Sequence, residues 1–201
     1  VPVTYAAVQA VLANQLSFTN NVTVGIAANN ADALNYVINN SASLAGAGVK
    51  LVDVDGAQVS LTMKQLSTLL SAGTGGITFV DTIKVSVSTA ADLAYFANSA
   101  KDILALQPVK ELSLDPSIIN IPLATAQLLA KSYHLTPPAT VLLDFASATK
   151  LSQDDFSALN KAGFVTFDFG GISVDPSAQL DTLVANLVGA GYKQGELPVE
   201  V

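Results

Sequence analysis

The chain has 201 residues, half of them hydrophobic, and its charged residues give a formal net charge of −7. All nine basic residues are lysines, which argues against a nucleic-acid partner and an anionic membrane surface, because both need clustered basic side chains. Cysteine is absent, so a disulfide-stapled module, a thiolate metal site and a cysteine nucleophile are excluded. No run of 18 apolar residues occurs, so we expect no membrane insertion.

The sequence repeats itself along its length. Three long stretches align, each reading strand, helix, strand, and a shorter strand–helix unit fills the gaps between them. The long stretches are 22–55, 83–115 and 172–201, and the short units begin at Ala57 and Ile118. Residues 148–171 depart from both patterns, with a shortened helix. A period of roughly 30 residues predicts a stacked array, in which each unit buries its apolar face on its neighbours.

The first residues parallel the short unit. The sequence PVTYAAVQAVLANQLSFTNNVTV, from Pro2, aligns with VSLTMKQLSTLLSAGTGGITFVDT, from Val59. It has no basic segment of the kind that opens a signal peptide. We therefore expect residues 1–201 to form a single repeat-array domain that is entered within a unit, as a processed chain or a fragment of a longer one.

Strands are predicted by apolar residues that alternate with polar ones, since successive strand side chains face opposite ways. The alternating apolar sets are Ile83/Val85/Val87, Val52/Val54, Leu112/Leu114 and Val165/Phe167/Phe169.

Helices are predicted by apolar stripes at a spacing of 3.6 residues, which place one face on a sheet. The stripes are Leu66/Leu69/Leu70, Leu93/Phe96/Ala97/Ala100/Leu104 and Leu180/Leu183/Val184/Leu187/Val188. Capping signals precede the helices at Thr89 with Asp92, Ser152 with Asp155, and Asp175 with Pro176. Ala-Gly pairs at Gly48, Gly73, Gly163 and Gly191 predict left-handed glycines that end helices.

Aspartates recur at the ends of the predicted strands. They are Asp55, Asp81, Asp115, Asp144 and Asp168. Stacked units would bring them into an acidic row that binds Ca²⁺, because carboxylate oxygens are its preferred ligands. The alternative is that each carboxylate bonds nearby backbone in an Asx-turn. The Asp53-Val-Asp55-Gly56 segment lacks the further ligands of a calcium loop and reads as an Asp-Gly turn.

The other titratable candidates have structural interpretations. His134 is the single histidine and follows a predicted helix, so we expect it in solvent at a helix C-terminus, where the dipole favours it. Asp154 and Asp155 could form a general-acid pair, but both fall in the first turn of a predicted helix, where carboxylates are stabilised anyway.

The two unit types resemble repeats of a known class of protein. One reads IKVSVSTAADLAYF…ELSLD, and the other reads VSLTMKQLSTLL or IPLATAQLLAKS. This alternation resembles the strand–helix repeats of very large secreted bacterial surface proteins, adhesin-like or surface-layer-like and often exported by a type I route. The resemblance implies an extracellular structural or adhesive role and brings no catalytic residues. A composition without Cys and Arg, rich in Ala, Ser, Thr and Asn, is typical of such exported proteins.

We therefore expect an α/β repeat solenoid with a largely parallel sheet, similar to a leucine-rich-repeat array. The alternative is a compact doubly wound α/β domain, which alternating strands and helices also predict.

As function, the sequence favours a non-enzymatic structural and adhesive module at the cell surface. It would self-associate or contact neighbouring repeats through its end strands, near Val3 and Val199, and could meet a glycan or a host surface. One alternative is a module that binds Ca²⁺ or a glycan at the acidic strand ends. Another is an α/β enzyme that uses Asp144 and Asp168, because open α/β sheets place their sites at strand carboxyl ends. No cofactor other than Ca²⁺ is expected.

Overall fold

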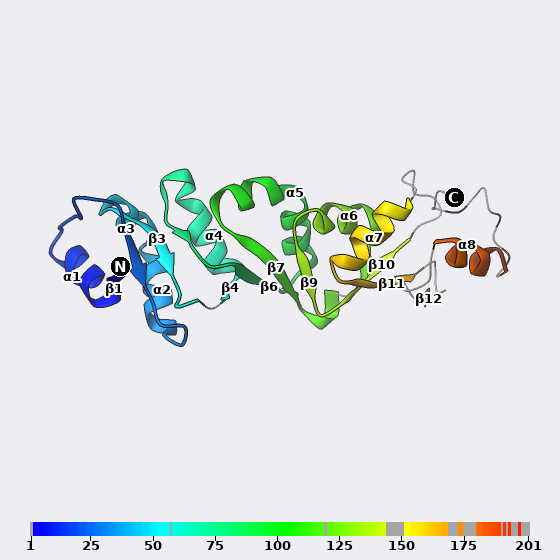
Figure 1. The fold of residues 1–201 in the computed structure, drawn as a ribbon, viewed down its shortest axis with the longest axis horizontal. Coiled ribbons are helices and arrows are strands. Elements are labelled where there is room, and N and C mark those ends of the chain that lie inside the picture. The colour runs from blue at the N-terminus through cyan, green and yellow to red at the C-terminus, as the bar shows by residue number, and fades with distance from the viewer. Residues whose placement is uncertain are drawn as a thin grey trace. The chain divides into compact units, whose positions relative to one another are not determined.

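Strands and helices alternate through the described part of the chain (Figure 1). A computed structural model describes residues 2–56, 58–118, 120–143, 151–168, 173–174 and 180–189, with 191, 193 and 197. Eight α-helices and two 3-10 helices lie among these residues. The expected α/β class with mainly parallel sheets is confirmed.

The described strands form three four-stranded sheets. Their orders are β1-β2-β3-β5, β4-β6-β7-β9 and β8-β10-β11-β12. β12 runs antiparallel to β11, whereas the registers discussed below are parallel. The strands are β1 (Val3–Thr4), β2 (Val22–Gly25), β3 (Val49–Asp53), β4 (Val59–Thr62), β5 (Thr78–Phe79), β6 (Ile83–Val87), β7 (Val109–Leu114), β8 (Asn120–Pro122), β9 (His134–Thr136), β10 (Ala139–Leu142), β11 (Phe164–Asp168) and β12 (Ser173–Val174).

The helices lie between these strands in the chain. They are α1 (Tyr5–Ala13), α2 (Ala31–Asn39), α3 (Ser41–Gly46), α4 (Met63–Ser71), α5 (Ala90–Leu106), α6 (Leu123–Ala130), α7 (Gln153–Lys161) and α8 (Leu180–Gly189), with the 3-10 helices η1 (Gly73–Gly75) and η2 (Pro116–Ile118). The chain divides into two compact units, 1–86 with 101–110 and 87–100 with 111–201.

The first compact unit has its core between the sheet β1-β2-β3-β5 and the helices that follow these strands. α1 contacts α3, and α2 contacts both α3 and α4. Val24, Val52 and Phe79 of the sheet are buried, as is Leu66 of α4. α4 begins with a capping box, in which Thr62 Oγ1 accepts from Gln65 N at 3.3 Å and Gln65 Oε1 accepts from Thr62 N at 2.8 Å, so two of the free backbone donors at the start of the helix are satisfied.

The second compact unit packs α6 against α7 beside β8, β10 and β11. Phe156 of α7 stacks on Phe167 of β11 with ring centroids 4.7 Å apart. Phe96 of α5 meets Tyr133 edge to face at 5.5 Å. All four aromatic side chains are buried, and such pairs add about 0.5–1.5 kcal/mol beyond their buried area.

The caps and ends of the helices follow the sequence prediction. Ser152 and Asp155 form the expected capping box at α7, and Thr89 Oγ1 accepts from Asp92 N at 3.1 Å. All four predicted helix-ending glycines have positive φ: Gly48, Gly73, Gly163 and Gly191. The cap predicted at Asp175 and Pro176 lies outside the described residues.

Two apolar residues do not face the core as predicted. Val165 is 43% exposed and the neighbouring Phe164 is fully buried. The cause is an irregularity in the register, since Ala139 pairs with Phe164 but Thr140 pairs with Thr166. One extra residue on a strand shifts its alternation. In α8, Val188 is 44% exposed although it belongs to the predicted stripe, while Val184 and Leu187 are buried.

In the third long stretch of the sequence, β12 and α8 lie where a strand and a helix were predicted. The sequence pattern places it at 172–201, where β12 is antiparallel to its neighbour and part of the stretch lies outside the described residues. A further strand–helix–strand order, which the sequence pattern did not align with the long stretches, runs through β10, α7 and β11, with β10 and β11 parallel. The sequence pattern predicted the helix at Ser152 and the strand at Val165, but it did not join them into a repeat because residues 148–171 match neither unit type.

Candidate functional site

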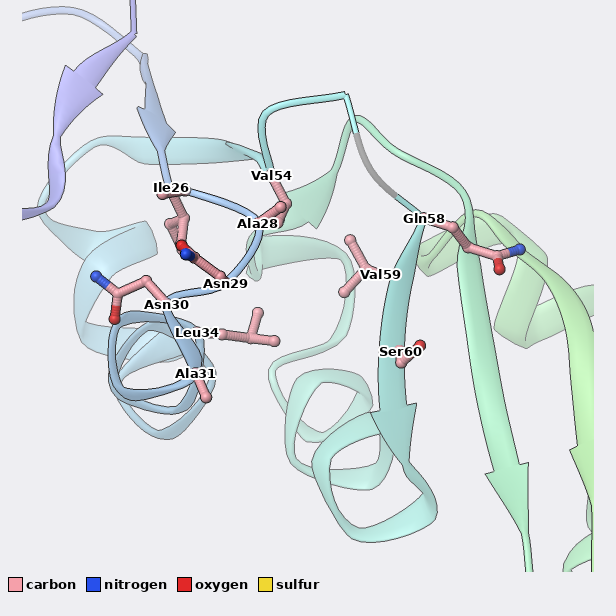
Figure 2. A pocket seen from close by; sticks show the side chains of 11 residues that line it. Ile26, Ala28, Asn29, Asn30, Ala31, Leu34, Val54, Gln58, Val59 and Ser60 are labelled. Atoms are coloured by element: carbon pink, nitrogen blue, oxygen red, sulfur yellow. The ribbon is translucent and has the colours of Figure 1, made fainter.

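The carboxyl ends of β2 and β3 open onto a small pocket (Figure 2). It has a volume of about 210 Å³. Asn30 begins α2 beside it, with its Oδ1 accepting from Ala33 N at 2.9 Å. Leu34 of α2 and Val59 of β4 point toward each other across the pocket, whereas Gln58 extends away from α2 (Figure 2). Its lining side chains are neutral, so it offers hydrogen-bonding groups and apolar surface.

A second pocket, of about 280 Å³, lies beside the chain that leaves β2. Pro2, Gly25, Ile26, Ala27, Asp53 and Asp55 line it, and Ile26 and Ala27 belong to both pockets. Two carboxylates therefore share one hollow at the end of the first sheet. Both pockets fall below the roughly 300–1,000 Å³ usual for small-molecule sites, so an ion or a single sugar ring fits this space better than a large substrate.

The acidic strand ends are used differently from one another. Asp55 has a φ of +47° and precedes Gly56 at +70°, which confirms the predicted Asp-Gly turn. The carboxylate of Asp81 accepts from Val54 N at 2.7 Å. Asp115 Oδ1 accepts from Ser117 N at 2.9 Å and from Ser117 Oγ at 2.6 Å, and these bonds lower the pKa of Asp115.

The Asx-turn interpretation therefore holds for Asp115, whereas Asp81 bonds backbone that is distant in the chain. Within the described ranges, no three His, Asp or Glu side chains gather into a group that could hold a metal ion. Asp168 ends β11, where its carbonyl accepts from Leu143 N at 2.8 Å. Asp144, its proposed catalytic partner, lies outside the described residues.

The remaining sequence candidates have structural contacts. His134 is exposed, but it opens β9 rather than ending a helix, and its Nδ1 lies 3.2 Å from the carbonyl of Lys161 at the end of α7. Its neighbour is thus the C-terminus of a different helix from the one predicted. Asp154 and Asp155 lie in the first turn of α7. Ser152 Oγ and N donate to Asp155 at 2.6 and 3.1 Å and lower its pKa.

Two turns join strands in the same way and were only partly visible in the sequence. The carbonyl of Ala47 accepts from Phe18 N at 2.8 Å, and that of Gly48 accepts from Val22 N at 2.9 Å. The same pair of bonds recurs in the second compact unit: Ala162 accepts from Leu135 N at 2.8 Å, and Gly163 accepts from Ala139 N at 3.0 Å. The Ala-Gly signal predicted the turn but not the segments bound to it.

Gln107 is a residue that the sequence pattern did not single out. It is 3% exposed, its Nε2 donates to the carbonyl of Ile77 at 2.8 Å, and its Oε1 accepts from Phe79 N at 3.4 Å. It precedes Pro108, whose carbonyl accepts from Ile83 N at 3.0 Å. A polar residue directly before a proline and a strand is the only signal that could have drawn attention to it.

No helix in the described ranges is long and apolar enough to cross a membrane. Searches of protein-family models, curated proteins and solved structures found no match to the chain. Its function therefore has to be argued from its own geometry.

Proposed function

We propose that this chain is a structural module of repeated strand–helix units that acts through its repeated surfaces and its ends, as an adhesive or structural part of a secreted bacterial surface protein. The observation that carries the proposal is one arrangement of strands that recurs three times. Each sheet takes a short strand before a helix, then the two strands of a strand–helix–strand segment, then a strand from further along the chain. Matched positions in the three sheets support this interpretation.

The short strands match at their ends. Thr4, Thr62 and Pro122 each occupy the N-cap of the next helix. Each also pairs with the fourth residue of the neighbouring strand: Thr4 with Gly25, Thr62 with Ser86, and Pro122 with Leu142. The helices that follow are eight or nine residues long. Equal register and nearly equal helix length are what repetition of one unit would produce.

The closing strands of the segments match in burial. β3, β7 and β11 each bury their first and fourth residues: Val49 and Val52, Val109 and Leu112, Phe164 and Phe167. Strict alternation would bury positions one, three and five. In β3 and β11 the same single-residue irregularity accounts for the spacing, at Lys50 and at Val165.

The fourth strands link consecutive units. The chain passes from β3 to β4 of the next sheet, returns as β5 to pair in parallel with β3, and then leaves again as β6. β9 pairs in parallel with β7 in the same way, after β8 and α6. Strands that pair with the preceding segment give each unit a binding surface for its neighbour, which is the property a stacked array needs.

Deletion of one complete repeat of this strand arrangement, which spans two of the roughly 30-residue units, tests the proposal. Removing residues 62–121 joins Leu61 to Pro122, so that β4 leads into α6 at the matched position. A repeat array should refold with β9 on β3 and β10 on β4, and should unfold cooperatively. The control deletes 62–91, half that length, which joins Leu61 to Asp92 and puts α5 where α4 stood, and should not fold. Loss of cooperative unfolding in both variants would favour the compact doubly wound domain.

A second candidate function is binding of Ca²⁺ or a glycan at the acidic strand ends. The observation that favours it is the pocket that Asp53 and Asp55 share. Here a rise in thermal unfolding temperature with millimolar Ca²⁺ or with monosaccharides is expected, and it should vanish in a D53N/D55N variant. An unchanged temperature in the native chain would remove this candidate and leave the structural role intact.

A further inference from the structure

One segment near the N-terminus has the features of a fourth strand but belongs to none of the three sheets. We infer that Leu16–Thr19 is a docking strand that pairs in parallel with the closing strand of a further strand–helix–strand unit placed ahead of β1. This inference rests on the proposed function and identifies the surface and the partner through which the array extends. It also moves the N-terminal contact from Val3, where the sequence pattern placed it, to Leu16–Thr19.

A backbone hydrogen bond fixes this segment in the same way as one fixes β9. Phe18 N donates to the carbonyl of Ala47, and Leu135 N donates to the equivalent carbonyl of Ala162, both at 2.8 Å. Leu135 also pairs, through its other edge, with Leu112 of β7. Phe18 keeps the first connection, and within the described residues it has no counterpart of the second.

The sequence of the segment matches β5. Leu16-Ser-Phe-Thr19 corresponds to Ile77-Thr-Phe-Val80, with an apolar residue, a hydroxyl, phenylalanine and a β-branched residue in the same order. In β5, Phe79 pairs with Val52, and Val80 N donates to the carbonyl of Val52 at 2.8 Å. Phe18 should therefore lie beside the fourth residue of the partner strand, and Thr19 N should donate to its carbonyl.

The apolar side chains of this segment are more exposed than those of the matched, paired strands, as expected for a strand edge without a partner. Leu16 is 60% exposed and Phe18 is half-buried, whereas Ile77, Phe79 and Leu135 are at most 2% exposed. An exposed edge with large apolar side chains is a template for pairing with another strand. A partner strand would cover Phe18 as β3 covers Phe79.

The occupant follows from how the chain pairs its own strands. β5 and β9 each pair with a closing strand that precedes them in the chain, β3 and β7. The closing strands of a second copy already have partners, because β3 pairs with β5, β7 with β9, and β11 with β12. The occupant is therefore a strand of the β3 type, apolar at its first and fourth residues, that belongs to a unit ahead of β1 in the same polypeptide.

A fusion tests the inference with the full chain intact. A copy of residues 1–58 is placed directly ahead of residue 1, which reproduces the natural spacing because Thr4 and Thr62 occupy matched positions. The Thr19 amide of the full chain should then exchange at least 100-fold more slowly than in the unfused chain. A T19P substitution, which removes this donor, is the control: it should abolish the pairing in the fusion and leave the unfused chain as stable as before.

A disulfide gives an independent measurement, since the chain has no native cysteine. In the unfused chain, L51C with T78C joins residues that are paired neighbours in β3 and β5, a separation suited to a disulfide, and it calibrates the yield. In the fusion, L51C in the added copy with S17C in the full chain should oxidise to a similar yield.

Three results would overturn the inference: no disulfide, an unchanged Thr19 exchange rate, or an added copy that stays unfolded ahead of an intact chain. The deletion of 62–121 retains Leu16–Thr19, so the repeat proposal and the docking strand can fail separately.

Discussion

The turn that precedes the closing strand is built in two different ways. Before β3 and β11 the backbone makes it, with an alanine carbonyl and a left-handed glycine binding two neighbouring segments. Before β7 the residue pair is Gln107-Pro108, and the buried side chain of Gln107 holds the neighbouring strand instead. The comparison shows that the connection is kept while its chemistry changes, which a sequence pattern based on glycine alone does not detect.

Of the two kinds of turn, the glycine turn should lose more stability on substitution. A Cβ at Gly163 would lie 2.7 Å from the carbonyl oxygen of Leu135, and φ there is +101°. Because both backbone strain and a backbone contact oppose it, G163A should lower the free energy of unfolding by about 2–3 kcal/mol. At Gly48 the nearest atom is 3.2 Å away, so G48A should cost less. Urea titration of both variants measures the difference, and an equal or reversed order would contradict the comparison.

The stability of the turn at Gln107-Pro108 should depend on the hydrogen bonds of the Gln107 side chain. Q107A leaves the buried carbonyl of Ile77 without its donor, and an unsatisfied buried polar group costs about 1–3 kcal/mol. Q107L keeps most of the volume and loses the same bonds, so it separates the hydrogen bonds from the cavity. Both variants should lose stability in urea titration. A Q107L variant as stable as the native chain would show that packing alone holds β5.

A buried hydroxyl offers a contrasting case. Tyr133 Oη is buried and has no hydrogen-bond partner, and burial raises the pKa of Tyr133 far above its usual range. Removing an unsatisfied group relieves its desolvation, so Y133F should leave stability unchanged or raise it by up to about 1 kcal/mol. The ring contact with Phe96 remains in this variant. A clear loss in thermal unfolding temperature would show that the hydroxyl has a partner in solution.

The smallest effect concerns pH. Because Ser152 lowers the pKa of Asp155, the ionised carboxylate stabilises the fold above the ordinary aspartate pKa of about 3.9. This contribution is lost as pH falls through the lowered pKa of the folded state. Since the group is only partly buried, the effect should be below about 0.5 kcal/mol. Thermal unfolding of D155N should show a weaker acid dependence between pH 5 and 2 (roughly the range over which such carboxylates titrate); an identical pH profile would rule this out.

The sequence predicted the α/β class, the capping box at Ser152 and the left-handed glycines, because these depend on local chemistry. It also predicted the likeness between the segments from Pro2 and Val59, which the matched positions of Thr4 and Thr62 support. It missed the strand–helix–strand segment through β10, α7 and β11, because residues 148–171 match neither unit pattern, although the helix start at Ser152 and the strand at Val165 were predicted. Nor could it foresee that Asp81 binds the backbone of Val54, a contact between residues distant in the chain.

The acidic strand ends show the same limit. Their recurrence was visible in the sequence, but their use depends on what lies beside each one. Asp115 bonds Ser117 two residues away, whereas Asp53 and Asp55 line an open pocket. Local turns can be anticipated from neighbouring residues, while a shared hollow depends on strands brought together by the fold.

Native-state hydrogen exchange of the intact chain tests the central claim, that one set of connections recurs three times, most directly. The amides of Val22, Ile83 and Ala139 open the three matched strands and donate to the carbonyls of Gly48, Pro108 and Gly163. The account predicts strong protection at all three, far above that of the Thr19 amide. Exchange at any one of the three as fast as at Thr19 would contradict it.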